Sequence, residues 1–423
     1  MTGTALPLSD RIAAANAEAF ARLANAKPVW IDVRPALDCL PGMTRDTILH
    51  AGPPIAWADM CGPQKMGVVA AALHEGLAAT EEEAEAMLLA GEIRTAPCHE
   101  HGATGGMAGI TSASSPMAVV HDPVHDVTGH SQLFQGPAAG LQNRDDYNRE
   151  ARKRWTWLAE VLGPVLGAAV RATGGIPVKP LISRALEMGD ECHNRNSGGS
   201  AMMLNQLILP LLDTCEDPAR TQEALAYLIE NEQVSLVLSM AAGKAMADAC
   251  KGIPCSTMVT AMARNGVDFG IKVSGLGETW FTAPANRIEG LYFSSEYSDA
   301  DAVPDIGDSA IMETIGLGGH VQAAAPVLQQ FVDGSFARAC AMVEAMRTIT
   351  LGELTEFKIG TMDFIGAPAG IDIRKVVQTR ETPVIDTAIA HRKGGVIGAG
   401  QTRAPFGCFA DALRAFSKTY KPA

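Results

Sequence analysis

The sequence predicts a mixed α+β fold in which two α/β lobes flank an all-helical domain. Strand and helix signals alternate over about residues 28–125, as in an α/β layer. Helical periodicity without any strand signal follows, and strand signals then return towards the C-terminus. These observations place the lobes at residues 1–143 and 254–423, and the helical domain at residues 144–253.

The N-terminal lobe opens with a helical pattern over residues 9–26 and a buried strand at VWIDV (29–33). Thr80 and Glu83 form a T-x-x-E capping box, which predicts a short helix that ends at Gly91. Both signals are local, so we expect them to hold whatever the tertiary arrangement.

The helical domain contains helix patterns at 179–196, 199–213 and 219–250. The C-terminal lobe opens with Asn265-Gly266 between two β-rich runs, which is a strong hairpin signal. It continues with strand-like runs and a terminal helix, at residues 370–379, 383–391 and 406–418.

Charge and composition exclude several functional classes. The chain has 34 Lys and Arg against 47 Asp and Glu, a formal charge of −13, which argues against nucleic acid or a membrane surface as partner. Nine cysteines without a C-x-x-C pair read as reduced thiols, and we see neither a signal peptide nor an apolar run of membrane-spanning length. We therefore expect a cytoplasmic protein.

The stretch PCHEHGATGGMAGITSAS (97–114) predicts an anion-binding loop. Its glycines can present successive backbone N–H groups, and hydroxyl groups follow them. The candidate residues are Gly105, Gly106, Ser112 and Ser114, with His99 as a candidate for proton transfer. H-x-H at 99–101, and the histidines at 121, 125 and 130, also permit a metal, but a solvated turn explains them better and we expect none.

The stretch MGDECHNRNSGGS (188–200) allows three interpretations: a solvated helix end, a wall of an active site, or a metal site. If it is helical, Asp190 and His193 share one face, so that the carboxylate orients an imidazole. Glu191 and Arg195 are then spaced as a supporting ion pair.

Cations elsewhere are candidates for binding small anions. Arg264 and Lys272 flank the predicted hairpin, where we expect them on one face. The segment 370–405 is the most cationic of this acidic chain, with Arg374, His391, Lys393 and Arg403. Asp308 reads first as a helix N-cap, with Glu313 one turn further on as a supporting residue.

Several of these stretches together resemble the YlbE/YahG-like bacterial family. The blocks that carry the resemblance are HAGPP, PCH…GITSAS, MGDE-x-H-x-RN, ARNG…FGI-x-VSGLGE-x-WFTAP, GDSA…ET…G-x-GG and DIR-x-VV…TP-x-I-x-T-x-IAH…IGAG-x-x-RAP. They span about residues 28–410. The matching positions with candidate chemistry are His99, Ser112, Ser114, Asp190, Glu191, His193, Arg195, Arg264, Asn265, Glu278, Asp308, Glu313, Arg374, His391 and Arg403.

The resemblance implies a subunit of oxamate carbamoyltransferase, in allantoin catabolism. Such an enzyme moves the carbamoyl group of oxalurate to phosphate and forms oxamate and carbamoyl phosphate. It implies partners as well, an FdrA-like subunit and a third small subunit, and it leaves a homo-oligomer possible. No cofactor is expected.

Carbamoyl transfer needs cations for two anions and a group that protonates the departing nitrogen. We assign the catalytic roles to Asp190, His193, His99 and Arg374, and anion binding to Arg264, Asn265, Arg403 and His391 together with the 102–112 loop. Two alternatives stay open: a non-catalytic binding or scaffold subunit, and an enzyme that acts on a related carbamoyl or amide compound.

Overall fold

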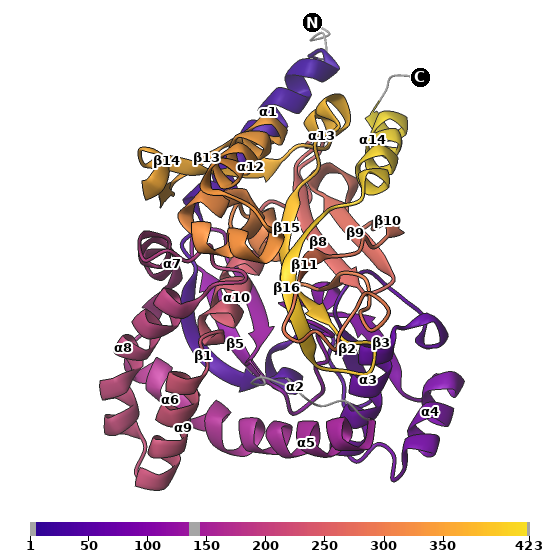
Figure 1. Cartoon of the computed structure of the whole chain (residues 1–423), viewed down its shortest axis with the longest axis vertical. Coiled ribbons are helices and arrows are strands. Elements are labelled where there is room, and N and C mark those ends of the chain that lie inside the picture. The colour runs from indigo at the N-terminus through magenta and orange to yellow at the C-terminus, as the bar shows by residue number, and fades with distance from the viewer. Residues whose placement is uncertain (1–5, 135–143, 421–423) are drawn as a thin grey trace, which may run out of the picture.

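The computed structural model describes residues 6–134 and 144–420, and it confirms the mixed α+β fold. The domain boundary predicted at residue 143 lies outside the described residues, and the three-part division stays a prediction. One hydrophobic core cluster draws residues from every part of the chain, from Ile12 to Phe416. Both termini lie at one end of the molecule, and α5 lies at the other (Figure 1).

The first part of the chain is built on an antiparallel sheet. Its strand order is β4-β6-β5-β1-β7, and only the β4–β6 contact is parallel. Helix α10 packs on β5 and β6, and α6 packs on β1. The strands are β1 (Val29–Pro35), β4 (Ala103–Thr104), β5 (Pro116–Asp122), β6 (Val127–Gln132) and β7 (Ile176–Pro177), and a separate parallel pair joins β2 (Thr47–His50) to β3 (Arg94–Pro97).

In the first part of the chain, helices form where local sequence signals predict them. Thr80 accepts a hydrogen bond from the Glu83 backbone N–H, and Gly91 ends the helix with φ of 77°, so the predicted cap and helix end are confirmed. The Glu83 carboxylate accepts the backbone N–H of Ala79, one residue before the position expected in a capping box. The helices and short 3₁₀ turns of this part are α1 (Leu8–Asn25), α2 (Ala36–Cys39), η1 (Trp57–Asp59), α3 (Gly62–His74), α4 (Glu81–Ala90) and η2 (Cys98–His101).

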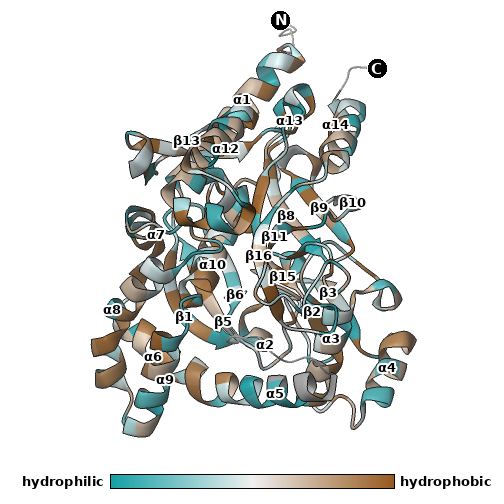
Figure 2. Cartoon of the chain, in the orientation of Figure 1, coloured by the Kyte–Doolittle hydropathy of each residue, from teal (hydrophilic) through white to brown (hydrophobic). Residues whose placement is uncertain are grey.

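Helices dominate the middle of the chain, as predicted. Figure 2 shows α5 as largely hydrophilic, which fits its position along the outside of the molecule, and α10 as more hydrophobic. The helices are α5 (Arg144–Trp157), η3 (Leu158–Leu162), α6 (Gly163–Ala172), α7 (Val178–Glu187), α8 (Ser197–Thr214), α9 (Pro218–Glu230) and α10 (Val234–Asp248). Among the described residues, no helix combines the length and the apolar character needed to cross a bilayer.

The predicted helix over 179–196 is wrong in its second half. Helix α7 ends at Glu187, and residues 188–196 form a loop that leads into α8. Gly189, with φ of 91°, turns the chain. The Glu191 carboxylate then accepts the backbone N–H groups that follow it, which takes the place of helical hydrogen bonding.

The last part of the chain contains three small sheets. Asn265-Gly266 forms the predicted hairpin between β8 and β9, with Gly266 at φ of 79°. The sheet orders are β10-β9-β8-β12, β11-β16-β15 and β13-β14. The strands are β8 (Val259–Asn265), β9 (Asp268–Val273), β10 (Phe281–Pro284), β11 (Glu289–Tyr292), β12 (Ile306–Gly307), β13 (Thr350–Ile359), β14 (Ile365–Ile371), β15 (Val384–Ala390) and β16 (Val396–Arg403).

The predicted strand over 370–379 is also wrong, because most of it is helix α13 (Ile373–Thr379). Asp372 is its N-cap and accepts the Arg374 backbone N–H at 2.9 Å. The remaining helical elements are η4 (Ser274–Leu276), α11 (Ile311–Thr314), η5 (Gly318–Ala324), η6 (Pro326–Val332), α12 (Phe336–Ile349), η7 (Gly360–Met362) and α14 (Phe406–Tyr420).

Candidate functional site

A continuous set of buried polar side chains lies where the two strand-rich parts of the chain meet the loop 188–196. We call it the polar seam. The segment 305–314, which contains β12 and α11, runs along it. None of its members is more than 7 % exposed: His99, Asp190, Glu191, His193, Arg264, Asp305, Asp308, Ser309, Glu313, Gln322, Asp386, Thr387 and Gln401.

At one end of the seam, Asp308 faces His99. The Asp308 carboxylate accepts the backbone N–H of Gly52 at 2.7 Å and that of Gly105 at 3.0 Å. His99 Nε2 lies 3.8 Å from an Asp308 oxygen, and both ring nitrogens of His99 lack a hydrogen-bond partner among the described residues. Burial raises the pKa of Asp308 to about 7 and lowers that of His99 well below its usual value.

This geometry corrects the prediction for Asp308, and anion binding by the glycine loop stays a prediction. Asp308 is not a helix N-cap, because its carboxylate bonds to backbone from distant loops and α11 begins after Ala310 without a side-chain cap. The glycine loop does present a backbone N–H to a carboxylate, but that carboxylate belongs to the chain itself. Gly106 is exposed on the same loop, with open space where a Cβ would stand.

Arg264 occupies the middle of the seam. Its Nε pairs with Asp305 at 2.8 Å, and its other nitrogens donate to the Gly307 carbonyl, to Ser309 and to Thr387. Asp305 also accepts the Thr387 hydroxyl at 2.9 Å. This guanidinium is fully buried and each of its three nitrogens donates a hydrogen bond, so it links β8, β12 and β15.

Arg264 and Lys272 do not share a face, contrary to the prediction. Arg264 pairs with Phe269 across the hairpin and Lys272 pairs with Ala261, so the two-residue alternation sends their side chains to opposite faces. Lys272 instead pairs with Glu278 at 2.6 Å and lies over the Trp280 ring.

The other end of the seam is a cluster of carboxylates around one imidazole. His193 Nδ1 and Glu313 Oε1 are 2.7 Å apart, and the same Glu313 oxygen accepts the backbone N–H of Gly319 and of Asp386. Burial alone would raise the pKa of Glu313, but His193 and these donors hold it below its usual value. Glu313 therefore stays ionised and fixes the orientation of the imidazole ring.

Asp386 and Glu191 complete this cluster. Asp386 accepts hydrogen bonds from the side-chain amides of Gln322 and Gln401 and interacts with Glu191 through their carboxyl groups. Burial, and then the charge of Glu313, raises the pKa of Asp386 to about 7. Burial also raises the pKa of Glu191 well above its usual range. The two side chains can therefore share a proton at neutral pH.

The pairing of Asp190 with His193 is wrong, because 188–196 is a loop. Asp190 accepts the Gly199 backbone N–H at 2.8 Å, at the start of α8, and lies 3.4 Å from Arg195 Nε. Arg195 thus faces Asp190 and gives Glu191 only its backbone N–H. His193 takes Glu313 as its partner instead.

The remaining predicted residues lie outside the seam, and several of them bond to backbone groups. Arg374 bonds to Asp372 and Thr257 beside α13, Arg403 pairs with Glu381, and His391 accepts the Lys393 backbone N–H. These cations do not form one cluster. Asn265 closes the hairpin turn, Ser112 bonds to Ser115, and Ser114 bonds to Glu75.

Sequence reasoning missed six seam residues: Asp305, Ser309, Gln322, Asp386, Thr387 and Gln401. One signal was present, since Asp386 interrupts the apolar run of β15. A carboxylate inside a buried strand needs partners, which marks it as unusual. Asp305 gave no such signal, because it lies in an aspartate-rich stretch that reads as a solvated loop. Within the described part of the chain, no group of three or more His, Cys, Asp or Glu could hold a metal ion.

Comparison with known proteins gives this site its context. The family model for "Oxamate carbamoyltransferase subunit AllG" matches residues 93–309. The chain is 42% identical to the Escherichia coli K12 protein of that name over 413 residues, which cover 96% of this chain and 98% of that protein. This chain belongs to the AllG family.

Two further relatives carry no assigned activity. The "Uncharacterized protein YahG" of Escherichia coli K12 is 41% identical over 98% of this chain and 88% of its own length. A crystal structure of a conserved protein of unknown function from Enterococcus faecalis V583 superposes with a TM-score of 0.94 at 39% identity. It covers 98% of this chain, and all of that chain is matched. The resemblance to the YlbE/YahG-like family is thus confirmed.

The backbone of Gly318 lies against the side chains of Glu313 and His193, so a substitution at Gly318 tests the position of this pair. A Cβ at Gly318 would lie 2.1 Å from Glu313 Oε1, and the backbone φ is 56°. We expect Gly318→Ala to lower the free energy of unfolding by about 1–2 kcal/mol for the left-handed backbone, plus about 1–3 kcal/mol for overpacking. Urea-induced unfolding measures the loss.

The matched control is Gly76→Ala. Gly76 has φ of 70° but no atom within 4 Å of its added Cβ, so only the backbone cost applies. Equal losses for the two variants would show that Glu313 is not held where the structure places it.

The raised pKa of Asp308 predicts a pH dependence of stability. A folded pKa near 7 against an ordinary value of 3.8 means that the folded chain binds the extra proton more tightly than the unfolded chain. The stabilisation is complete below about pH 4 and is lost as the pH rises towards 7, by an amount on the order of a few kcal/mol.

Asp308→Asn removes this titration and one acceptor for a backbone N–H. We expect the wild type to exceed the variant in stability most strongly at pH 4.5 and least at pH 7.5, as measured by urea-induced unfolding. The exposed Asp213→Asn serves as control. A gap between wild type and Asp308→Asn that is constant with pH would contradict the assignment.

Proposed function

We propose that this chain is a subunit of a carbamoyltransferase that acts between oxalurate and phosphate and forms oxamate and carbamoyl phosphate. The observation that carries the proposal is the 42% identity, over almost the whole of both chains, to a protein named as a subunit of oxamate carbamoyltransferase. The word subunit also supports further chains in the active enzyme, for which an FdrA-like protein and a third small subunit are our candidates.

The reaction defines what the polar seam would have to supply. A phosphate oxygen attacks the carbamoyl carbon, the bond from that carbon to the amide nitrogen breaks, and the departing nitrogen takes up a proton. Proton transfer of this kind needs an acid positioned within hydrogen-bond reach of that nitrogen. His193, held by Glu313, and Asp386, with its pKa of about 7, are the candidates in this chain.

His99 with Asp308 is a second candidate acid–base pair, at the other end of the seam. Asp190, proposed earlier as a catalytic residue, now has a positioning role at the start of α8. Arg264 is committed to Asp305, Ser309 and Thr387, so we assign it to the framework of the site. Every seam side chain is buried, so reaction there requires the seam to open or the proton to pass outward along it.

The same burial favours a second candidate function. A set of charged side chains that is closed to solvent and largely paired within the chain also suits a subunit that binds and supports a catalytic partner. In that case the chemistry belongs to the partner, and the buried seam of this chain keeps the fold rigid beneath the surface that the partner contacts. Both candidates agree with a cytoplasmic enzyme complex.

The test is reconstitution. The chain is co-purified with its FdrA-like and small partner proteins, and carbamoyl phosphate is measured after addition of oxalurate and phosphate. We expect product only when this chain is present. The assembled complex without product from oxalurate would contradict the proposed substrate, and full turnover without this chain would contradict its participation.

A further inference from the structure

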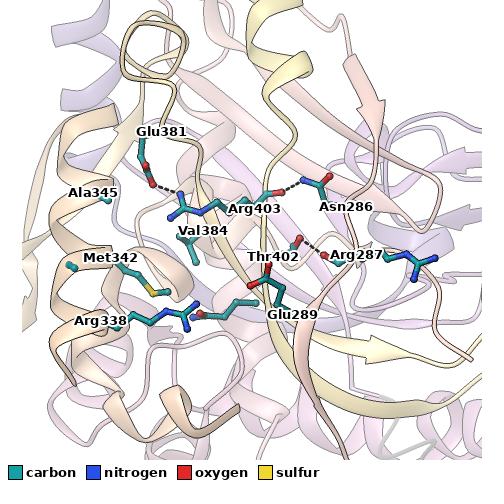
Figure 3. Close-up of a pocket in the computed structure, with 12 residues that line it drawn as sticks. Asn286, Arg287, Glu289, Arg338, Met342, Ala345, Glu381, Val384, Thr402 and Arg403 are labelled. Atoms are coloured by element: carbon teal, nitrogen blue, oxygen red, sulfur yellow. Dashed lines mark hydrogen bonds and ion pairs between the residues drawn. The ribbon is translucent and has the colours of Figure 1, made fainter. Parts of the chain in front are cut away.

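A cavity of ≈ 470 Å³ lies beside the seam, between α12 and the sheet β11-β16-β15. Its size falls in the range of small-molecule sites. Figure 3 shows Arg338 and Met342 reaching from α12 towards the strands that carry Glu289, Thr402 and Arg403. The lining residues are Asn286, Arg287, Glu289, Arg338, Ala341, Met342, Ala345, Glu381, Val384, Gln401, Thr402 and Arg403.

The three arginines that line this cavity differ in whether a carboxylate of the chain pairs with them. Arg403 pairs with Glu381 and donates to the Thr382 carbonyl at 2.9 Å, and Arg287 lies near Asp299. Arg338 donates to the Val332 carbonyl at 2.9 Å and makes no ion pair within residues 6–134 and 144–420. A guanidinium that retains free donors and a net charge is suited to bind a carboxylate.

The opposite wall offers acceptors in place of donors. Gln401 is 7 % exposed, and its Nε2 donates to Asp386 at 2.9 Å. Its Oε1 has no partner in the described part of the chain. Glu289 pairs with Gln401 across the antiparallel strands β11 and β16, so their side chains stand next to each other on one face. A buried amide oxygen that accepts no hydrogen bond destabilises the folded chain, and a ligand that donates an N–H to it removes this cost.

We propose that this cavity binds a small carboxylate that also carries an amide or ureido group. The carboxylate of the ligand lies against Arg338, and its N–H groups donate to Gln401 Oε1 and Glu289. The inference rests on the proposed function in one respect, because oxamate and oxalurate are the members of this class that the reaction names.

The position of the cavity connects it to the seam. Gln401 pairs with Asp386 in the strand register and bonds to its side chain, so only one amide separates the ligand from the Asp386–Glu191 pair. A ligand nitrogen bound to Gln401 Oε1 thus lies at the outer end of the seam, where a proton from its carboxyl groups would emerge.

Titration calorimetry on the full chain tests the proposal with four probes. Oxamate has both the carboxylate and the amide, oxalate lacks the N–H donors, pyruvamide lacks the carboxylate, and inorganic phosphate lacks both. We expect oxamate to bind at least ten-fold more tightly than any of the other three. Oxalate or phosphate binding as tightly as oxamate would overturn the amide assignment.

Variants locate the binding. Arg338→Gln should weaken oxamate binding at least ten-fold, and Gln401→Leu should reduce the preference for oxamate over oxalate. Arg414→Gln, an exposed arginine of α14 that pairs with Asp411, should bind like the wild type. Unchanged affinity in Arg338→Gln, or no oxamate binding by the wild type, would overturn the cavity assignment.

The two proposals fail separately. Carbamoyl transfer by the reconstituted complex, together with oxamate affinity that Arg338→Gln leaves intact, would reject the cavity and keep the function. Oxamate binding that depends on Arg338, in a complex that produces no carbamoyl phosphate, would reject the function and keep the cavity.

Discussion

Replacing Arg264 by methionine should lower the free energy of unfolding by about 3–5 kcal/mol, because it leaves the buried Asp305 carboxylate without its cation. Arg264 and Asp305 are both inaccessible to solvent, and their ion pair is 2.8 Å long. The variant also loses hydrogen bonds to Ser309 and Thr387. Urea-induced unfolding at pH 7 measures the change.

Arg287→Met is the matched control for this experiment. Arg287 lies 3.4 Å from Asp299, but both side chains are largely exposed, so we expect a loss below about 1 kcal/mol. The double variant Arg264→Met/Asp305→Asn should recover part of the loss, since it removes the unpaired charge. If Arg264→Met unfolds at the same urea concentration as the wild type, the central ion pair is not formed in solution.

The second large effect concerns His193 and Glu313 as a unit. In the reconstituted complex, His193→Gln should reduce kcat for carbamoyl phosphate formation by about 10²–10⁴-fold, the range of a lost acid–base group. Glu313→Gln should also reduce kcat, because the imidazole loses the carboxylate that orients it. The double variant should lose little more than His193→Gln alone, as expected for residues that act together.

Steady-state kinetics on the three variants provide this cycle, with unfolding curves to show that each variant is folded. Losses that multiply in the double variant would show that the two residues act independently. In that case Glu313 has only a structural role.

Signals that act over a few residues were the reliable part of the sequence. The helix cap at Thr80, the hairpin at Asn265-Gly266 and the strand at 29–33 all formed, because turn and cap chemistry is local. The overall α+β class followed from the same kind of signal.

Long-range pairing could not be predicted. Arg264 bonds to Thr387, which lies 123 residues later in the chain, and His193 pairs with Glu313, which lies 120 residues later. The spacing of these residues in the sequence does not predict either pair. The loop 188–196 failed for a related reason. Asp190 and His193, and likewise Glu191 and Arg195, have helical spacing, yet both carboxylates accept backbone N–H groups, and helical periodicity does not distinguish the two cases.

The sequence therefore predicted many of the residues of the candidate site but not the pairs that they form. The predicted residues that lie in the polar seam are His99, Asp190, Glu191, His193, Arg264, Asp308 and Glu313. Arg374 does not, because Asp372 begins a helix where the alternating pattern suggested a strand, and the guanidinium turns back to its own cap.

The most direct test of the central claim, that carbamoyl transfer depends on the polar seam, compares His193→Gln with Arg374→Gln in the reconstituted complex. Both variants are assayed for carbamoyl phosphate formation from oxalurate and phosphate under the same conditions. We predict at least a 100-fold loss for His193→Gln and near wild-type turnover for Arg374→Gln. Wild-type turnover by His193→Gln, with activity lost in Arg374→Gln, would contradict the account.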